Sequence, residues 1–473
     1  MNQPPQPRTG LRVGALDLGR VLVIGIASAA PGYSLAAALG LVTVSAGVHM
    51  PAMLLLAFLP MACVATAFDQ FNRIDPDCGT SFAWVTRAFG PSAGWLTGWA
   101  IIAADIVVMA SLAQISAQYS LAFFGLSATA HPQLSIAIGI MWLAATTWIC
   151  FRGITFSANL QAFLLVLELA VLLTLAALML HAVYFAPTPA GVRPALAWFT
   201  TSGLSPRAWM DAMGIAIFLY WGWDSALNVN EETQDARRTP GRAALLSTLA
   251  LVGIFVVTGT AALSWAGPGF LISHQDDVLS ALAAQVLGRP WDKLLHAVVL
   301  TSAIAATQTT ILPTARTVLS MAQKGALPEG FATIHPVHQI PSRATLWMGV
   351  ISVVWYVALT QATTAVVAAS LQALNLLVAF YYGLTGIACA WHFRRDARTV
   401  RTFALRIVAP LLGGLSLFAM LIGLILWPSS DDSADKVLPV ALALALMGVG
   451  TVLMLAHRAH QSRFWRTRAA ADD

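Results

Sequence analysis

The sequence predicts an all-α polytopic membrane protein with about twelve transmembrane helices. Hydrophobic residues make up 58% of the 473-residue chain and charged residues only 10%, whereas ordinary globular domains carry about 25% charged residues. Apolar runs of about 20 residues, the length that spans a bilayer, recur along the whole chain. Two of these runs are broken near their middles, at 29–32 and at 222–225. Paired breaks five segments apart are typical of membrane proteins built from two inverted repeats.

The apolar runs divide the chain into twelve candidate spans. They lie at 21–46, 48–69, 94–124, 133–151, 158–184, 208–230, 243–266, 293–322, 344–361, 364–391, 404–427 and 437–457. Most loops between them are short, so no separate soluble domain is predicted. We expect an N-terminal tail at 1–20, a core of ten helices at 21–391, two peripheral helices at 392–457 and a C-terminal tail at 458–473.

Lys and Arg alternate between the two sides of the predicted membrane. With the N-terminus inside, 21 of the 26 Lys and Arg residues fall in the inner segments, as expected because cytoplasmic loops carry the excess of positive charge. Both tails are therefore predicted to be cytoplasmic, in a multi-pass protein of the plasma or inner membrane. The basic pI of 9.2 follows from this topology and does not indicate nucleic-acid binding.

The first break follows Gly25-Ile26-Ala27 and reads Ser28-Ala29-Ala30-Pro31-Gly32-Tyr33. Proline removes a backbone donor and glycine tolerates unusual dihedrals, so together they unwind a helix. Unwinding frees carbonyls before the break and amides after it, and these can bind cationic and anionic groups respectively. The break therefore predicts a binding site, although a simple proline kink in a packed helix is the alternative.

The second break reads Tyr220-Trp221-Gly222-Trp223-Asp224. A carboxylate this deep in a membrane span is costly and by default functional. The three aromatic side chains beside Asp224 could gate a pocket or hold an ammonium group by cation–π contact. Their alternative role is an aromatic belt at the membrane interface.

Two further acidic residues, Asp105 and Glu168, fall inside the third and fifth spans. No Lys or Arg lies at a comparable depth, so the midplane carries an excess of carboxyl groups. This disfavours an anionic substrate and favours a proton, a metal cation or an amine. The alternative for each is a neutral carboxyl bonded to a neighbouring helix.

Three motifs, in order along the chain, carry a family resemblance. The first motif is Gly79-Thr80-Ser81-Phe82-Ala83-Trp84 with Arg87, followed by Gly94-Trp95-Leu96-Thr97-Gly98-Trp99. The second is 218–240, which contains Gly222-Trp223-Asp224-Ser225 and Glu231-Glu232-Thr233. The third is 315–328, followed by His335-Pro336. Over nearly its whole length the sequence resembles the permeases of the amino acid–polyamine–organocation (APC) superfamily.

The resemblance implies a five-plus-five inverted repeat of the LeuT-like kind with two added helices. It also implies alternating access, with substrate held between the breaks of helices 1 and 6. Members that take up amino acids usually offer the substrate carboxylate a small residue flanked by glycines in the first break. Here that stretch has Gly32 as its one glycine after Ser28, and Pro31 has no amide to offer.

On this basis we expect a secondary active transporter that moves amino acids. An importer or exchanger of amines or polyamines with the same fold is the alternative, and a non-transporting sensor or channel is a second alternative class. The expected partners are a small-molecule substrate and the lipid bilayer. No enzyme, cofactor or metal is expected, because the chain shows no histidine pair with metal-ligand spacing, no phosphate-binding glycine loop and no nucleophile with a visible base.

The expected site residues fall into three groups. Substrate contacts are assigned to Ser28, Ala29, Ala30, Gly32, Tyr33, Asp105, Tyr220, Trp221, Gly222, Trp223 and Asp224. Glu168, which aligns with a lysine of some proton-coupled relatives, is the expected proton-coupling residue. A sodium site at Thr301 and Ser302 is the less favoured alternative, with Gln308 a further candidate in the pocket. Arg87, Glu231 and Glu232 are the expected gating residues.

Overall fold

The computed structural model describes residues 10–186, 191–275, 277–362, 364–426, 433–459 and 463–466. The predicted tails lie partly outside these ranges. The helices are α1 (Leu18–Ala29), α2 (Pro31–Ala46), α3 (Met50–Ile74), α4 (Ser81–Phe89), α5 (Pro91–Phe123), α6 (Pro132–Phe151), α7 (Ile154–Phe185), α8 (Pro206–Leu219), α9 (Ser225–Asn228), α10 (Thr239–Ser273), α11 (Val278–Val286), α12 (Lys293–Gln323), α13 (Ser342–Thr360), α14 (Thr364–His392), α15 (Val400–Phe403), α16 (Ala409–Leu426) and α17 (Ser433–Ala459).

The all-helical membrane fold is confirmed. Ten stretches of the described chain are long and apolar enough to cross a membrane. One of these stretches, 18–74, contains the first two predicted spans, and the interrupted sixth span is formed by α8 and α9. Each of the twelve predicted runs therefore corresponds to one helix or to one broken helix.

Local sequence signals explain where several helices begin. The Asp17 side chain accepts a hydrogen bond from the Arg20 amide at the start of α1, and Ser205 does the same for Ala208 at the start of α8. Proline stands in the first turn of α2, α3, α5, α6, α8 and α10. At that position proline loses no hydrogen bond, because the first amides of a helix have no partner within the helix.

The first predicted break lies between α1 and α2. Ala30 adopts the left-handed conformation, with φ 47° and ψ 67°, and Pro31 begins α2 directly after it. The second break spans 220–224, between α8 and α9, where Gly222 has φ 114°. Both breaks are therefore real interruptions of the helix, and the alternative of a simple proline kink in the first is wrong.

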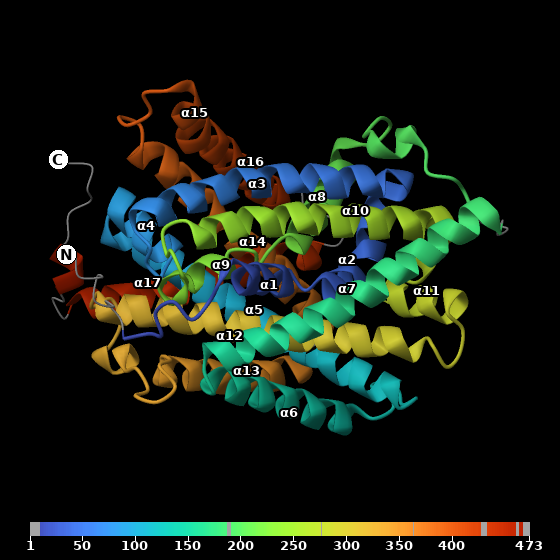
Figure 1. The fold of residues 1–473 in the computed structure, drawn as a ribbon, viewed down its shortest axis with the longest axis horizontal. Coiled ribbons are helices and arrows are strands. Elements are labelled where there is room, and N and C mark those ends of the chain that lie inside the picture. The colour runs from blue at the N-terminus through green and yellow to red at the C-terminus, as the bar shows by residue number, and fades with distance from the viewer. Residues whose placement is uncertain are drawn as a thin grey trace.

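The broken helices lie inside the bundle. Helix α1 packs against α7, α10 and α12, whereas α2 packs against α8, α10 and α12. Figure 1 shows α1 and α9 near the middle of the molecule, with longer helices around them. Helices α6 and α13 lie together on one side of the bundle, at the bottom of the view. This arrangement brings backbone that is not helical to the centre of the protein.

The last two spans face away from the centre. Helix α16 packs on α3 and α14, and α17 packs on α14 and α5. In the most apolar windows of 400–426 and 437–459, 28% and 22% of residues are buried, against 78% in α5. Most of their surface is therefore left for lipid.

Two predicted loops contain short helices. Helix α4 lies within the 70–93 loop, and α11 lies within the 267–292 loop, after a kink at Gly267 in α10. Helix α4 packs against α5, and α11 packs against α2, α7 and α12. These segments cover the two ends of the bundle. We call the end that carries 75–90, 229–238 and 324–341 the basic end, because these segments contain Arg87, Arg237, Arg238 and Lys324. Residues 10–17 lie at the same end (Figure 1), where Leu16 bonds to Glu232 and Gln234.

Candidate substrate site

A small central cavity lies between the two breaks. Its volume is about 20 Å³, which is room for roughly one water molecule. This cavity, as it stands, is therefore too small to hold an amino acid or an amine. The cavity is lined by Ser28, Ile101, Asp105, Trp221, Gly222, Asp224, Ser225, Asn228, Thr309, Thr310, Pro313 and Tyr381.

Asp224 is held by two tyrosines from α14. The Tyr382 hydroxyl donates to Asp224 Oδ1 over 2.8 Å, and the Tyr381 hydroxyl donates to Oδ2 over 3.3 Å. The Trp221 indole N–H donates in turn to the Tyr381 oxygen over 2.7 Å. A chain of donors thus runs from one side of the break to the carboxylate, and it fixes the direction in which Asp224 points.

Asp105 brings a second carboxyl group to the same cavity. It lies on α5, and its Oδ2 is 2.5 Å from the Thr314 hydroxyl of α12. Asp105 and Asp224 are 6% and 7% exposed, and neither forms an ion pair within the described ranges. The cavity lining contains no Lys, Arg or His. Two carboxyl groups without a protein counter-charge favour a cationic ligand.

The amides of the first break are already satisfied within the protein. The Gly32 amide donates to Glu168 Oε1 over 2.6 Å, and the Tyr33 amide donates to the Ser302 hydroxyl over 3.1 Å. Ser302 itself donates to the same Glu168 oxygen over 2.8 Å. Glu168 and Ser302 are both fully buried. The start of α2 is therefore occupied by side chains from α7 and α12.

A pair of hydroxyl groups joins the two breaks. Ser28 Oγ and Ser225 Oγ lie 2.7 Å apart, and Ser225 also donates to the Thr309 carbonyl over 3.3 Å. The end of α1 and the start of α9 therefore meet at the cavity wall. A shift of either segment changes the cavity directly.

Five of the predicted substrate contacts line the cavity: Ser28, Asp105, Trp221, Gly222 and Asp224. The other six are buried but do not line it: Ala29, Ala30, Gly32, Tyr33, Tyr220 and Trp223.

Two of the aromatic side chains in the second break point away from the cavity. The Tyr220 hydroxyl donates to the Leu54 carbonyl of α3, and Trp223 packs on Phe68 and Tyr382. Consecutive residues in the unwound segment point in different directions, so residues that are neighbours in sequence do not all line the cavity. The alternative of an interfacial aromatic belt does not describe them either, since both are fully buried.

Two other predicted contacts serve the α2 terminus. The Tyr33 hydroxyl lies 2.8 Å from Ser111 Oγ of α5, outside the cavity lining. A Cβ atom added to Gly32 would lie 3.2 Å from Glu168 Oε1. Gly32 therefore allows the close approach of Glu168.

The sequence reasoning missed the contributions of α12 and α14. Tyr381 and Tyr382 hold Asp224, while Thr309, Thr310 and Thr314 place hydroxyl groups along the cavity side of α12. The available signal was a pair of tyrosines and a run of threonines within two otherwise apolar spans. Periodicity does not identify the inward face of a helix that is apolar all round.

The predicted sodium pair is only partly assembled. Ser302 lies at the break, whereas the Thr301 hydroxyl donates to the Val298 carbonyl within its own helix. Gln308, the further candidate, does not line the cavity and instead accepts a hydrogen bond from Ser157 of α7 over 2.9 Å. The hydroxyl of Ser302 is thus the one predicted oxygen that lies beside Glu168.

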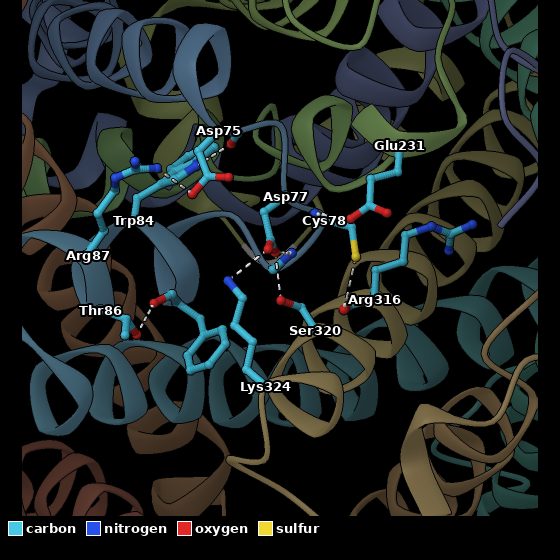
Figure 2. A network of polar contacts seen from close by, with 12 residues as sticks. Asp75, Asp77, Cys78, Trp84, Thr86, Arg87, Glu231, Arg316, Ser320 and Lys324 are labelled. Carbon is cyan, nitrogen blue, oxygen red and sulfur yellow. Dashed lines mark hydrogen bonds and ion pairs between the residues drawn. The ribbon is translucent and has the colours of Figure 1, made fainter. Parts of the chain in front are cut away.

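A network of charged residues closes the basic end (Figure 2). Asp77 accepts from the Lys324 ammonium over 2.7 Å, from the Ser320 hydroxyl and from the Gly79 amide. Burial would raise the pKa of Asp77, but the Lys324 charge and these hydrogen bonds hold that pKa below its usual range. The loop after α3 is therefore attached to the end of α12.

A buried ion pair lies beside this contact. Arg316 of α12 binds Glu232 Oε2 through Nη2 and Nε, at 2.5 and 2.6 Å, and both side chains are at most 1% exposed. Glu231 accepts from the Cys78 amide over 3.0 Å, and Asn228 donates to the Cys78 carbonyl. The segment after α9 is thus joined to both α12 and the loop after α3.

The third predicted gating residue behaves differently. Arg87 forms an ion pair with Asp75 over 3.0 Å, and its side chain is 42% exposed. Figure 2 shows this pair to one side of Asp77. It lies at the same end of the bundle as the buried pair but at its surface.

Asp77, Cys78 and Glu231 bring three possible metal ligands within 4.8 Å of one another. Burial, together with the charges of Glu231 and Asp77, raises the pKa of the Cys78 thiol well above its usual range. A neutral thiol is a poor metal ligand, and Asp77 already binds Lys324. We therefore assign no metal to this cluster.

Comparison with known proteins gives the family. Residues 11–452 match the sequence model of the family described as amino acid permease. An uncharacterized transporter of Mycobacterium tuberculosis is 26% identical over 362 residues, which cover 74% of this chain and 76% of the relative. The low-affinity putrescine importer PlaP of Escherichia coli is 22% identical over 459 residues, 95% of each chain. The branched-chain amino acid permease BcaP of Bacillus subtilis is 22% identical over 358 residues, 72% of this chain and 73% of the relative. The chain belongs to the amino acid permease family, within the APC superfamily that its motifs resemble.

Proposed function

We propose that this permease moves an organic amine across the membrane by alternating access. At the coarser level it is a multi-pass membrane transporter of amino acids or amines and is not an enzyme. The proposal concerns the choice between these two substrate classes, the coupling and the orientation. One observation carries it: Asp105 and Asp224 line one cavity that has no cationic side chain.

The aromatic groups around Asp224 support an ammonium ligand. Trp221 and Tyr381 both line the cavity, and the π-face of an aromatic ring attracts a cation that has lost its water. Asp105 and Asp224 come from different elements, α5 and the break before α9. A molecule with a single ammonium could bind Asp224, and a diamine could also reach Asp105 once the cavity has widened. The match to the relative named as a putrescine importer covers 95% of each chain.

An amino acid is the second candidate substrate. The relative of Bacillus subtilis that is named as a branched-chain amino acid permease matches 72% of this chain, and the ammonium of an amino acid could also bind Asp224. Its carboxylate would need free donors, which the family usually supplies from the first break. The occupation of the Gly32 and Tyr33 amides by Glu168 and Ser302 makes this candidate the weaker one.

We extend the proposal to coupling and orientation. Glu168 is buried in the span α7 without an ion pair in the described ranges, and such a group can carry a proton through a transport cycle. We therefore propose proton coupling at Glu168, with sodium as the alternative at Ser302. We also propose that the basic end faces the cytoplasm of a cell membrane, because positive loops remain inside.

The test is binding by the purified protein, measured as the shift in melting temperature with amino acids and their decarboxylated amines. A ligand that binds the folded state raises its apparent stability. We expect amines to stabilise the protein, and Asp224→Asn to weaken their binding at least about ten-fold, or about 1.4 kcal/mol. Glu329→Gln removes an exposed carboxylate in the 324–341 loop and should leave binding unchanged. Stabilisation by amino acids alone would reject the amine proposal, and binding without accumulation in vesicles would indicate a sensor.

A further inference from the structure

The start of α2 has the chemistry of an anion site. It is a 16-residue helix whose N-cap, Ala30, offers no side-chain hydrogen bond. Amides at a helix N-terminus attract negative groups, because they lack partners and lie at the positive end of the helix dipole. In this position a transporter of amino acids could hold the substrate carboxylate.

In this protein every donor of that first turn has a partner. Pro31 has no amide, Gly32 donates to Glu168, Tyr33 donates to Ser302, and Ser34 donates to the Ala30 carbonyl. The carboxylate that fills the position comes from α7, so it is part of the protein. Its Oε1 lies 2.6 Å from the Gly32 nitrogen, which is close enough to satisfy that amide.

A substrate carboxylate would have to displace Glu168 to reach these amides. Glu168 Oε2 is buried and has no hydrogen-bond partner among the described residues, and Glu168 forms no ion pair within them. Displacement would leave a second carboxylate close by without its donors. Removing the partner of a buried charge costs several kcal/mol, which is comparable with the whole binding energy of a weakly bound substrate.

We propose that Glu168 replaces the substrate carboxylate, so that the site accepts amines and rejects amino acids. Glu168 is a specificity-determining residue in this proposal, which rests on the proposed transport of amines. It binds the part of the site that an amino acid would need, while Asp224 remains available for the ammonium. Ser302 completes the cap by accepting from Tyr33 and donating to Glu168.

The test compares two substitutions at Glu168. Glu168→Ala frees the Gly32 amide and leaves space for a carboxylate, whereas Glu168→Gln keeps a carbonyl oxygen that still accepts from Gly32 and Ser302. We expect Glu168→Ala to bind parent amino acids at least ten-fold more tightly than the wild type does. Glu168→Gln should show no such gain. A gain of binding cannot result from partial unfolding.

A second measurement does not depend on the identity of the substrate. Acetate is the smallest probe that carries the missing carboxylate and a methyl group. At high concentration it should raise the melting temperature of Glu168→Ala by about 2 °C or more relative to chloride. It should leave the wild type and Glu168→Gln unchanged, since their amides are occupied.

The possible outcomes separate this inference from the proposed function. If wild-type protein binds amino acids as tightly as their amines, or if acetate stabilises all three proteins equally, Glu168 does not exclude carboxylates. The inference would also be wrong if Glu168→Ala bound amines but gained neither amino acids nor acetate. If amines do not stabilise the wild type, while acetate still stabilises Glu168→Ala and not the other two proteins, amine transport is rejected. The role of Glu168 at the α2 amides would then be kept.

Discussion

Gly222 shows how a single residue fixes the meeting of the two broken helices. Its φ of 114° lies in a region that residues with a Cβ atom rarely adopt. A Cβ atom there would also lie 2.7 Å from the Ser28 carbonyl oxygen and 2.8 Å from the Ser28 carbonyl carbon. Both atoms belong to the backbone and cannot move aside by a rotamer change. The two breaks thus touch because position 222 lacks a side chain.

We therefore expect Gly222→Ala to destabilise the folded protein by at least about 2 kcal/mol, since the dihedral strain alone costs about 1–3 kcal/mol. The measurement is the melting temperature in detergent. The matched control is Gly253→Ala on α10, where an added Cβ meets nothing within 4 Å and should change stability by less than about 1 kcal/mol. Similar melting temperatures for the two variants would mean that the breaks do not need this close approach.

At the scale of elements, the breaks were predictable but the faces around them were not. Pro31 and Gly222 mark interruptions in the sequence because their backbone chemistry opposes a continuous helix. Tyr381 gave no comparable signal, since α14 is apolar around most of its circumference and the choice of inward face depends on tertiary packing. Tyr220, which the sequence places in the pocket, does not line the small cavity, and its hydroxyl donates to the Leu54 carbonyl instead. The order of residues along an unwound segment does not show in which direction each side chain points.

Helix α7 carries a row of polar side chains that faces α12. Ser157, Gln161 and Glu168 are all fully buried, and their spacing places them on one side of α7. Gln161 donates to Ser157 over 3.0 Å, and Ser157 donates to Gln308 of α12. Glu168, the one acidic group of this row, also binds the start of α2. A change in its protonation would therefore act on the contact between α7 and the first break.

The proposed coupling gives a prediction for this pair of elements. In vesicles at zero membrane potential, an inward proton gradient should accelerate wild-type uptake. In Glu168→Gln the acceleration should disappear while exchange of internal for external substrate continues, because the glutamine keeps the hydrogen bonds but cannot exchange a proton. Asp105→Asn tests a second buried carboxyl of the core. Retained acceleration in Glu168→Gln would place coupling elsewhere, and a requirement for sodium would favour Ser302.

On the scale of the whole molecule, polar contacts join the helices at both ends of the bundle. At the end of the bundle opposite the basic end, the Tyr119 hydroxyl donates to Asp277 at the start of α11. At the basic end, Arg316 binds Glu232, and the Leu16 amide donates to the Glu232 carbonyl. The alternating access that we propose requires these contacts to open in turn. Breaking a buried pair by removing one partner costs about 3–5 kcal/mol, so we expect the loss of Glu232 to weaken the contacts at the basic end.

Opening of the basic end can be followed through Cys78, which is fully buried beside this pair. With Cys63, Cys150 and Cys389 replaced by alanine, we expect slow maleimide labelling of Cys78 and at least ten-fold faster labelling in Glu232→Gln. The buried Arg316 loses its counter-charge in Glu232→Gln, which favours the open, hydrated state.

Arg87→Ala breaks an exposed pair at the same end, worth about 0–1 kcal/mol, and should change the labelling rate about two-fold at most. If a version that keeps only Cys150 were labelled equally fast in Glu232→Gln, the variant would be unfolding. If Arg87→Ala matched Glu232→Gln, the surface pair would be the closure and the buried pair a structural contact.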